Sequence, residues 1–351
     1  MTKKYVVMVG SELSAPGGIS SVANTYKKSG FFEEADIKYL ASYDKPNKLS
    51  MILKFIHCLT SLFKLLISDS VGCVHVHSAS RGSFWRKVVI LKLSRFFGVK
   101  TIFHLHSGEF KNFYLSKSPS VQKFICNFLE QVDVVIALTE YWGGIIKDIS
   151  PNANVRVVSN PVDRIDANYN KNSNQILFLG RLRRTKGLYE LIDACALLKK
   201  QGFEFKLILA GDGDIEHVSQ LCHEKDLSDI VRLTGWVEGS TKEKLLLESD
   251  IFVLPSYFEG LPIGVLEAMA NRVAVIATSV GGIPDILKNG HDGLLIPPKD
   301  QLELANAIKM LLQHPDIKKT YINNAANRAS EQFNSKSVNR ALLKIYSSEE
   351  Y

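Results

Sequence analysis

The chain has 351 residues, of which 46% are apolar and 23% charged, a length that exceeds a typical single core and a composition that excludes a disordered or fibrous protein. Residues 1–164 carry 21 Lys+Arg against 12 Asp+Glu, whereas residues 165–351 carry 22 against 24. We therefore expect two domains, the first of which meets something anionic, such as a membrane surface or a phosphorylated acceptor. Nucleic acid is disfavoured, because no helix-turn-helix, zinc-finger spacing or aromatic RNA-binding strand accompanies the charge. The five scattered cysteines include no Cys-x2-Cys pair, so they indicate neither disulfides nor a zinc knuckle and fit a reducing cytoplasm.

The first predicted strand, at 5–9, is too short for the core of a signal peptide and leads into the segment GSELSAPGGISSV at 10–22. A G-x-G-x-x-G dinucleotide fingerprint would require glycine where Glu12 stands, so a Rossmann oxidoreductase is disfavoured. Gly17 and Gly18 precede a predicted helix start, where paired glycines let backbone amides approach an anion closely. The alternative for this pair is a plain strand-to-helix turn.

Two helices of the first half are predicted to be amphipathic. Residues 48–67 are apolar enough to raise the question of a transmembrane helix, but Lys54, His57 and Lys64 fall on one face. The opposite, apolar face comprises Phe55, Leu59, Leu62 and Leu66. Residues 84–97 combine basic with aromatic side chains and are the better candidate for contact with an anionic membrane. These side chains are Trp85, Arg86, Lys87, Lys92, Arg95, Phe96 and Phe97. The competing interpretation is that both helices cover their own sheet.

Histidines occur in pairs on two predicted strands of the first half. His75 and His77 lie in the strand at 71–80, and the strand at 101–110 contains His104 and His106. Spacing of two puts each pair on one side of its strand, where it could bind a metal. Because no third ligand has an obvious spacing, we expect hydrogen-bonded histidines without a metal.

A polar run at 164–174 has no apolar periodicity and is predicted to be the interdomain linker. In the loop between the strand at 175–179 and the helix at 188–200 stand Arg181 and Lys186. A guanidinium and an ammonium near a helix start form a cationic pocket suited to a diphosphate. Solvated surface charge is the alternative.

The stretch 251–298 reads as strand, loop, helix and strand, the crossover unit of a parallel sheet. Parallel sheets bind small ligands at the carboxyl ends of their strands, so Glu259 and the turn at 281–282 should lie at one cleft. Glu267 is expected on the first turns of the helix, whose unpaired amides would suit a phosphate. Those amides belong to Gly264, Val265 and Leu266. A nearby carboxylate is expected to accept hydrogen bonds from sugar hydroxyls, with a solvated charge as the alternative.

The pair Glu259-x7-Glu267, followed by VGGIP at 280–284, resembles the nucleotide-sugar site of glycosyltransferase family 4, retaining enzymes of the GT-B fold. The segment LFLGRLRRTKG at 177–187 is similar to the same family's Gly-Arg-Leu-x3-Lys-Gly signature. The resemblance implies an α/β fold of two doubly wound, Rossmann-like domains that face a central cleft. Its parts would be an N-terminal acceptor-side domain at 1–163, a C-terminal nucleotide-sugar-binding domain at 164–333 and a last helix at 334–351 that packs back on the first domain.

The resemblance also implies roles for single residues. Catalytic roles fall to His106, Arg181, Lys186 and Glu259, and the segment HSGEF at 106–110 resembles the family's histidine motif, in which His-Gly or His-Asp is the commoner form. The donor-binding set is Gly17, Gly18, Arg181, Lys186, Arg232, Glu259, Gly260, Leu261, Gly264, Val265 and Glu267. RLTGWV at 232–237 resembles the strand and loop beneath the nucleobase, with Trp236 structural rather than stacking. Asp212-Gly213-Asp214 has the form of a metal-binding Asp-x-Asp, but the family often has a Gly-Asp-Gly turn here, so no metal is expected.

The implied function is retaining transfer of a hexose from a nucleoside diphosphate sugar, without metal or other cofactor. A UDP-sugar is favoured, with a GDP-sugar as the alternative, and the acceptor would be a glycan or an undecaprenyl-linked glycan. The implied setting is bacterial capsule, lipopolysaccharide O-antigen or exopolysaccharide assembly, in the cytoplasm and peripherally on the inner face of the cytoplasmic membrane. One alternative is a GT-B sugar-nucleotide epimerase or hydrolase. The other is a non-catalytic sugar-nucleotide or membrane-binding module, against which both glutamates and both cations argue.

Overall fold

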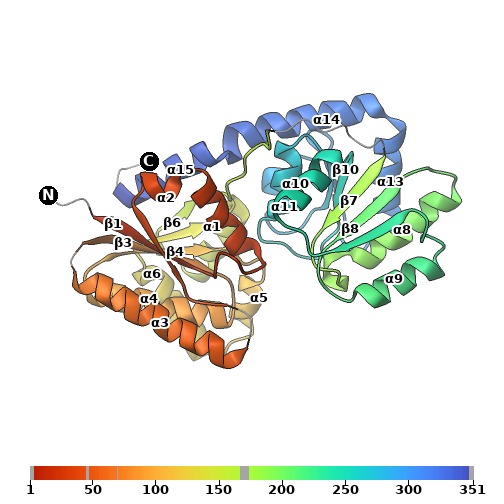
Figure 1. Cartoon of the computed structure of the whole chain (residues 1–351). Helices are drawn as coiled ribbons and strands as arrows, with labels where there is room; N and C mark the ends of the chain where they lie inside the picture. The colour runs from red at the N-terminus through yellow and green to blue at the C-terminus, as the bar shows by residue number, and fades with distance from the viewer. Residues whose placement is uncertain (1–3, 45–46, 69, 167–173, 348–351) are drawn as a thin grey trace. The chain divides into compact units, whose positions relative to one another are not determined.

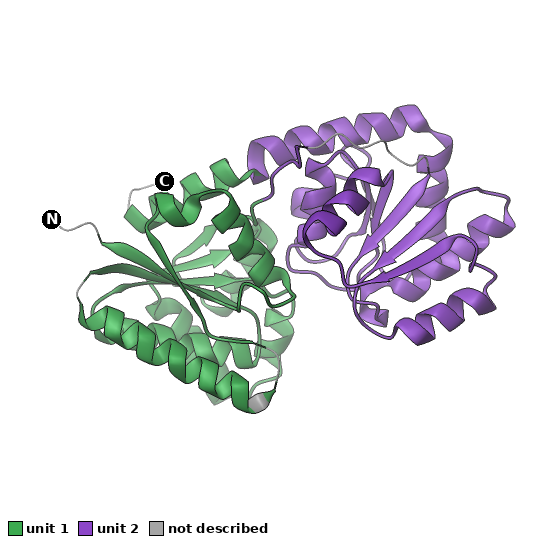
Figure 2. Ribbon diagram, viewed as in Figure 1, with its two compact units in different colours: residues 1–161, 334–351 green, residues 162–333 purple. Residues whose placement is uncertain are grey.

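The computed structural model describes residues 4–44, 47–68, 70–166 and 174–347. The chain forms two compact units, one of Met1–Pro161 with Asn334–Tyr351 and the other of Val162–Phe333 (Figure 2). Each unit contains a six-stranded sheet in which every neighbouring pair of strands runs parallel. Two parallel sheets with helices packed on them confirm the predicted α/β class.

Unit 1 has the strand order β2-β1-β3-β4-β5-β6 (Figure 1). Its strands are β1 (Tyr5–Gly10), β2 (Ile37–Ala41), β3 (Val71–Ser78), β4 (Lys100–Leu105), β5 (Val134–Ala137) and β6 (Val155–Val157). Its helices are α1 (Gly18–Lys28), α2 (Phe31–Glu34), α3 (Lys48–Ile67), α4 (Gly82–Phe96), α5 (Phe110–Leu115), α6 (Pro119–Gln131), α7 (Glu140–Ile149) and α15 (Ser335–Ser347). The strand order reverses between β1 and β3, and such a switch point is where doubly wound sheets bind ligands.

The two faces of the unit 1 sheet differ, because successive side chains of a strand point to opposite faces. Val74 and Val76 of β3 and Phe103 of β4 belong to an apolar core shared with α3 to α7. His75 and His104 alternate with them and therefore point to the other face. There, His75 Nδ1 lies 2.7 Å from the Tyr346 hydroxyl of α15.

Helix α15 packs on unit 1 although it follows unit 2 in the chain. The Tyr346 ring stacks on Phe31 at 6.1 Å between centroids, and Asn339 Nδ2 donates to Ser29 Oγ at 3.2 Å. These contacts tie the end of the described chain to α1 and α2.

Helix α3 matches its predicted range, but its exposed surface is less polar than predicted. Leu62 and Leu66 are buried as expected, and Cys58 is buried beside them. The exposed surface of the helix also carries large apolar side chains, which are Leu49, Ile52, Leu53, Ile56, Phe63 and Ile67. The expected polar residues therefore share the exposed surface of the helix with these apolar side chains.

The expectation for Lys87 of α4 is wrong. Its side chain is buried, and its ammonium donates to Ser42 Oγ just after β2. Burial, with a smaller contribution from Arg86, lowers the pKa of Lys87 to about 7. Arg86 is half-buried, so only Lys92 and Arg95 among the four cations expected on this helix are exposed.

Unit 2 has the strand order β12-β11-β10-β7-β8-β9. Its strands are β7 (Gln175–Leu179), β8 (Lys206–Ala210), β9 (Val231–Gly235), β10 (Ile251–Leu254), β11 (Ala274–Thr278) and β12 (Leu294–Ile296). Its helices are α8 (Leu188–Lys200), α9 (Ile215–Glu224), α10 (Gly239–Glu248), α11 (Ile263–Ala270), α12 (Ile283–Ile286), α13 (Gln301–Gln313) and α14 (Pro315–Arg328), with a 3-10 turn η1 (Arg184–Lys186) and a π turn η2 (Ala329–Phe333). The order reverses between β7 and β10, so the loops after these two strands flank the switch point of unit 2.

Candidate active site

Two of the predicted catalytic residues meet at the switch point of unit 2. Lys186 follows β7, Glu259 follows β10, and Lys186 Nζ lies 2.5 Å from Glu259 Oε1. The side chains are 22% and 11% exposed, respectively, so this charge-assisted pair is largely shielded from water. An anionic ligand that entered this position could replace Glu259 as the partner of the Lys186 ammonium.

Close backbone packing holds the two loops together. Tyr257 N donates to Thr185 O at 3.0 Å. Gly187 has a φ of +69°, and a Cβ at this position would lie 1.9 Å from the carbonyl oxygen of Pro255. Glycine is therefore required after Lys186 both by the left-handed backbone and by the approach of the second loop.

The turn at Gly281-Gly282 also lies beside the Glu259 loop. Gly282 N donates to Gly260 O at 3.1 Å, because β10 and β11 are neighbouring parallel strands. The loops that follow β7, β10 and β11 thus adjoin one another at one edge of the sheet.

Arg181 lies at the same edge, next to the Asp-Gly-Asp segment. Its Nε is 3.5 Å from Asp212 Oδ1, and both side chains are 43% exposed. Asp214 instead caps α9 by accepting from His217 N at 3.2 Å. The segment is therefore engaged as a turn and a helix cap, and the Arg181 guanidinium stays partly exposed beside it.

Glu267 lies on α11, where its Oε1 accepts from Lys242 Nζ at 2.6 Å. The expectation of three unpaired helix-start amides is partly wrong. Val265 N and Leu266 N both point to the carbonyl of Pro262, at 3.1 and 3.5 Å, because Pro262 begins the first turn. Within the described chain, only the Gly264 amide of the three is left for a ligand.

An open pocket of about 500 Å³ lies beside β9 and the loop that follows it. Arg232 and Trp236 both line it, and Trp236 is 44% exposed. The indole therefore lies at the wall of a pocket and not in the core, and its expected structural rather than stacking role stays a prediction.

In unit 1, Gly17 and Gly18 lie at the start of α1, after β1. Gly17 has a φ of +152°, and its carbonyl accepts from Ser20 Oγ at 2.8 Å. This loop flanks the switch point of unit 1, the position expected for a phosphate-binding turn.

His106 directly follows β4, and its Nε2 lies 2.8 Å from His77 Nδ1. Burial lowers the pKa of His106 to about 3, so the imidazole is neutral at pH 7. The His106 side chain also hydrogen-bonds Asn160, so a sugar hydroxyl that bonded the imidazole would have to replace His77 or Asn160.

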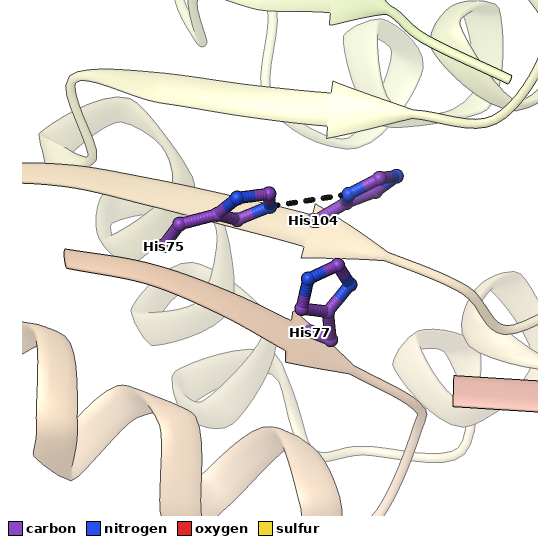
Figure 3. A group of neighbouring side chains, drawn as sticks. All are labelled: His75, His77 and His104. Atoms are coloured by element: carbon purple, nitrogen blue, oxygen red, sulfur yellow. Dashed lines mark hydrogen bonds between the residues drawn. The ribbon is translucent and has the colours of Figure 1, made fainter. Parts of the chain in front are cut away.

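The tertiary structure brings a third histidine, a candidate metal ligand, next to one pair. The sequence spacing had not identified it. β3 and β4 pair in register, with His77 opposite His104, which brings one ring nitrogen each of His75, His77 and His104 within 4.8 Å of one another (Figure 3). Burial and the neighbouring imidazoles lower the pKa of all three, so each is neutral and able to ligate a metal. However, His75 Nε2 and His104 Nδ1 share a hydrogen bond at 3.2 Å, and their rings stack at 14° between planes. Zinc at its usual bond length of about 2.1 Å would have to replace that hydrogen bond.

Three pairings at the site were not predicted from the sequence. Lys242 pairs with Glu267, His77 holds His106, and Tyr257 donates to Glu190 Oε1 at 2.6 Å. Each belongs to an element other than that of its partner. No local motif could have identified them.

Two family models match adjoining parts of the chain. Residues 4–164 match Glycosyltransferase Family 4, and residues 160–328 match Glycosyl transferases group 1. The two matches meet within a few residues of the boundary between the units and together span most of the chain.

Curated relatives include glycosyltransferases of bacterial polysaccharides and glycans. The WcaL glycosyltransferase named for colanic acid biosynthesis in Salmonella typhimurium is 27% identical over 265 residues, 70% of this chain and 63% of that protein. A GalNAc-alpha-(1->4)-GalNAc-alpha-(1->3)-diNAcBac-PP-undecaprenol alpha-1,4-N-acetyl-D-galactosaminyltransferase of Campylobacter jejuni is 32% identical over 47% of this chain and 46% of that protein. The matched segments thus span 63% and 46% of these relatives' own lengths.

Solved structures with the same fold cover nearly the whole chain. Sucrose-phosphate synthase from Thermosynechococcus elongatus has a TM-score of 0.79 at 19% identity, over 98% of this chain and 99% of that one. Anabaena HepE in complex with UDP-glucose has a TM-score of 0.75 at 18% identity, over 98% and 99%. These likenesses establish the two-domain GT-B fold. The chain therefore belongs to the glycosyltransferases of GT-B fold that join a family 4 domain to a group 1 domain.

Proposed function

We propose that the protein transfers a hexose, with retention of configuration, from a nucleoside diphosphate sugar to a hydroxyl of a glycan acceptor. The observation that carries the proposal is the meeting of Lys186 and Glu259 at the switch point of unit 2. The family matches support a glycosyltransferase, and the fold shared with a protein crystallised with UDP-glucose supports a UDP-sugar as donor.

The chemical problem is a leaving diphosphate that gains negative charge. Lys186 and the partly exposed guanidinium of Arg181 are the cations that would stabilise it, and the Gly264 amide would add a donor. Binding of the diphosphate would take the ammonium away from Glu259. The released carboxylate would then accept hydrogen bonds from the hexose and orient it.

Retention would follow from attack on the same face as the departing diphosphate, whose oxygen takes the proton of the acceptor hydroxyl. The anomeric carbon then loses its bond to the diphosphate and gains one to the acceptor oxygen. In this scheme the protein needs no metal, because cationic side chains carry out the neutralisation. Neutral His106 is our proposed hydrogen-bond partner for the donor sugar.

For the acceptor we propose a glycan on a polyprenyl diphosphate in assembly of a bacterial surface polysaccharide, at the inner face of the cytoplasmic membrane. Support comes from relatives named for colanic acid biosynthesis and for a diphospho-undecaprenol substrate. Such an acceptor would place the working enzyme at a membrane surface.

The test begins with a screen of nucleotide sugars by saturation-transfer NMR. The donor found is then labelled in its sugar and incubated with lipid-linked glycans. Label in the glycan supports the proposal, and its anomeric configuration reports retention. Label found only in free sugar would indicate a hydrolase, and an altered nucleotide sugar would indicate an epimerase. If no nucleotide sugar binds, the proposed function is refuted.

A further inference from the structure

Helix α3 carries a row of exposed apolar side chains along its outer face. Its members recur every three or four residues, with one gap at Thr60, and are Leu49, Ile52, Leu53, Ile56, Phe63 and Ile67. They are between 45% and 66% exposed. Contiguous apolar surface of this kind usually marks a contact with a membrane or another protein.

The row continues onto α4, which lies beside α3 (Figure 1). The Phe63 ring contacts Phe97 at 5.7 Å between centroids, and Phe97 contacts Phe96 at 5.5 Å. Phe96 is 84% exposed, and Val89 is exposed on the same helix. We call the α3 row together with Val89 and Phe96 the docking face.

By length and composition α3 could cross a bilayer, over Leu49–Ile67. Its inner side, however, packs into the core of unit 1 through Cys58, Leu62 and Leu66. If α3 left this position, part of one face of the sheet would lose its cover, and parallel sheets occur almost only with both faces covered. The helix is therefore suited to lie along a surface rather than to span it.

The charge around the docking face is one-sided. Residues 48–97 contain eight Lys+Arg and one Asp, but Lys87 is buried and Lys54 pairs with Glu12. Lys64, Lys92 and Arg95 are exposed on α3 and α4. A second copy of the chain would bring like charges together across the face, whereas an anionic leaflet would attract them.

We propose that the docking face binds the surface of an anionic phospholipid bilayer, with α3 lying parallel to the membrane plane. The apolar row would enter the boundary between headgroups and acyl chains, and the cations would contact lipid phosphates. This inference rests on the proposed function in one respect, since it explains how the enzyme reaches a lipid-linked acceptor.

The experiment is flotation of the full-length protein with vesicles of phosphatidylglycerol and phosphatidylethanolamine, compared with phosphatidylcholine alone. The test variant is Ile52→Gln/Ile56→Gln/Phe63→Gln. All three side chains are exposed, so folding should not depend on them. The matched control, Ile215→Gln/Leu302→Gln/Ile317→Gln, changes three exposed apolar residues of unit 2.

Wild type and control should float with the anionic vesicles, and the test variant should bind at least tenfold more weakly. Lys64→Ser/Lys92→Ser/Arg95→Ser should also bind more weakly, with the difference from wild type shrinking as salt rises. Three results would overturn the proposal. One is equal flotation of the test variant and wild type. Another is resistance of the bound protein to alkaline carbonate, which would indicate a span. The third is absence of flotation together with a dimer, seen in sedimentation velocity, that the test variant abolishes.

Nucleotide binding keeps this test separate from that of the proposed function. The test variant should bind UDP with wild-type affinity, because its changes lie outside unit 2. Flotation without nucleotide binding would refute the proposed function and leave the docking face intact. Nucleotide binding and sugar transfer without flotation would refute the docking face and leave the proposed function intact.

Discussion

The contact between Lys186 and Glu259 makes the substitution Glu259→Gln informative about both stability and function. The substitution removes the counter-charge of an ammonium that is only 22% exposed. Charge-assisted hydrogen bonds contribute about 1.5–3 kcal/mol, and breaking a pair of intermediate burial should lower the free energy of unfolding by about 2 kcal/mol. In a domain of the size of unit 2, this loss of stability lowers Tm by about 4–8 °C.

A double-mutant cycle with Lys186→Met measures the interaction itself. The double variant should recover about 2 kcal/mol relative to the sum of the two single changes, measured by urea denaturation. Calorimetry with UDP should show no loss of affinity in Glu259→Gln, since the ammonium no longer has to leave a carboxylate, while sugar transfer slows.

The matched control is Lys318 and Asp250, a second 2.5 Å pair in unit 2 with both side chains 13% exposed. Lys318→Met and Asp250→Asn should couple similarly and leave UDP binding and transfer unchanged. Additive effects at the first pair, or UDP binding more than tenfold weaker in Glu259→Gln, would refute this reasoning.

Four further predictions follow from the site and from buried charge. Arg181→Ala should slow transfer by about a hundredfold, because it deletes a contact that strengthens in the transition state; a folded variant at wild-type rate would contradict its role. Glu267→Gln should weaken UDP binding if this carboxylate accepts from ribose hydroxyls, and calorimetry showing equal affinity would rule that out. Transfer should survive EDTA, whereas loss of activity that Mg²⁺ or Mn²⁺ restores would return a metal to Asp212 and Asp214. Finally, burial lowers the pKa of Lys87 to about 7, so between pH 7 and 9 the unfolded state binds more protons than the folded state. Wild-type stability relative to Lys87→Met should rise with pH by up to about 1.4 kcal/mol per unit, and a constant difference in urea denaturation would show that Lys87 is not buried in solution.

The chain's local patterns were sufficient for the fold class and the family. Helix α8 begins and ends at the predicted residues, 188–200, because Gly187 starts it and its apolar positions recur at helical spacing. The buried strands are short continuous apolar runs, as in β5 and β10, which is typical of parallel sheets covered on both faces. Signals of this kind depend on residues near one another in sequence, so they can be recognised without the tertiary structure.

Contacts between distant elements needed the tertiary structure. Lys186 and Glu259 are 73 positions apart, and only the reversal of strand order between β7 and β10 makes them neighbours. The register of β3 and β4 decided that His104 joins His75 and His77. Lys87 is charged, as is typical of a surface residue, whereas the row on α3 is apolar, as is typical of a core. Packing nevertheless buries Lys87 and exposes the row. Periodicity reports which residues share a face of a helix, but which face meets the protein depends on the elements packed against it.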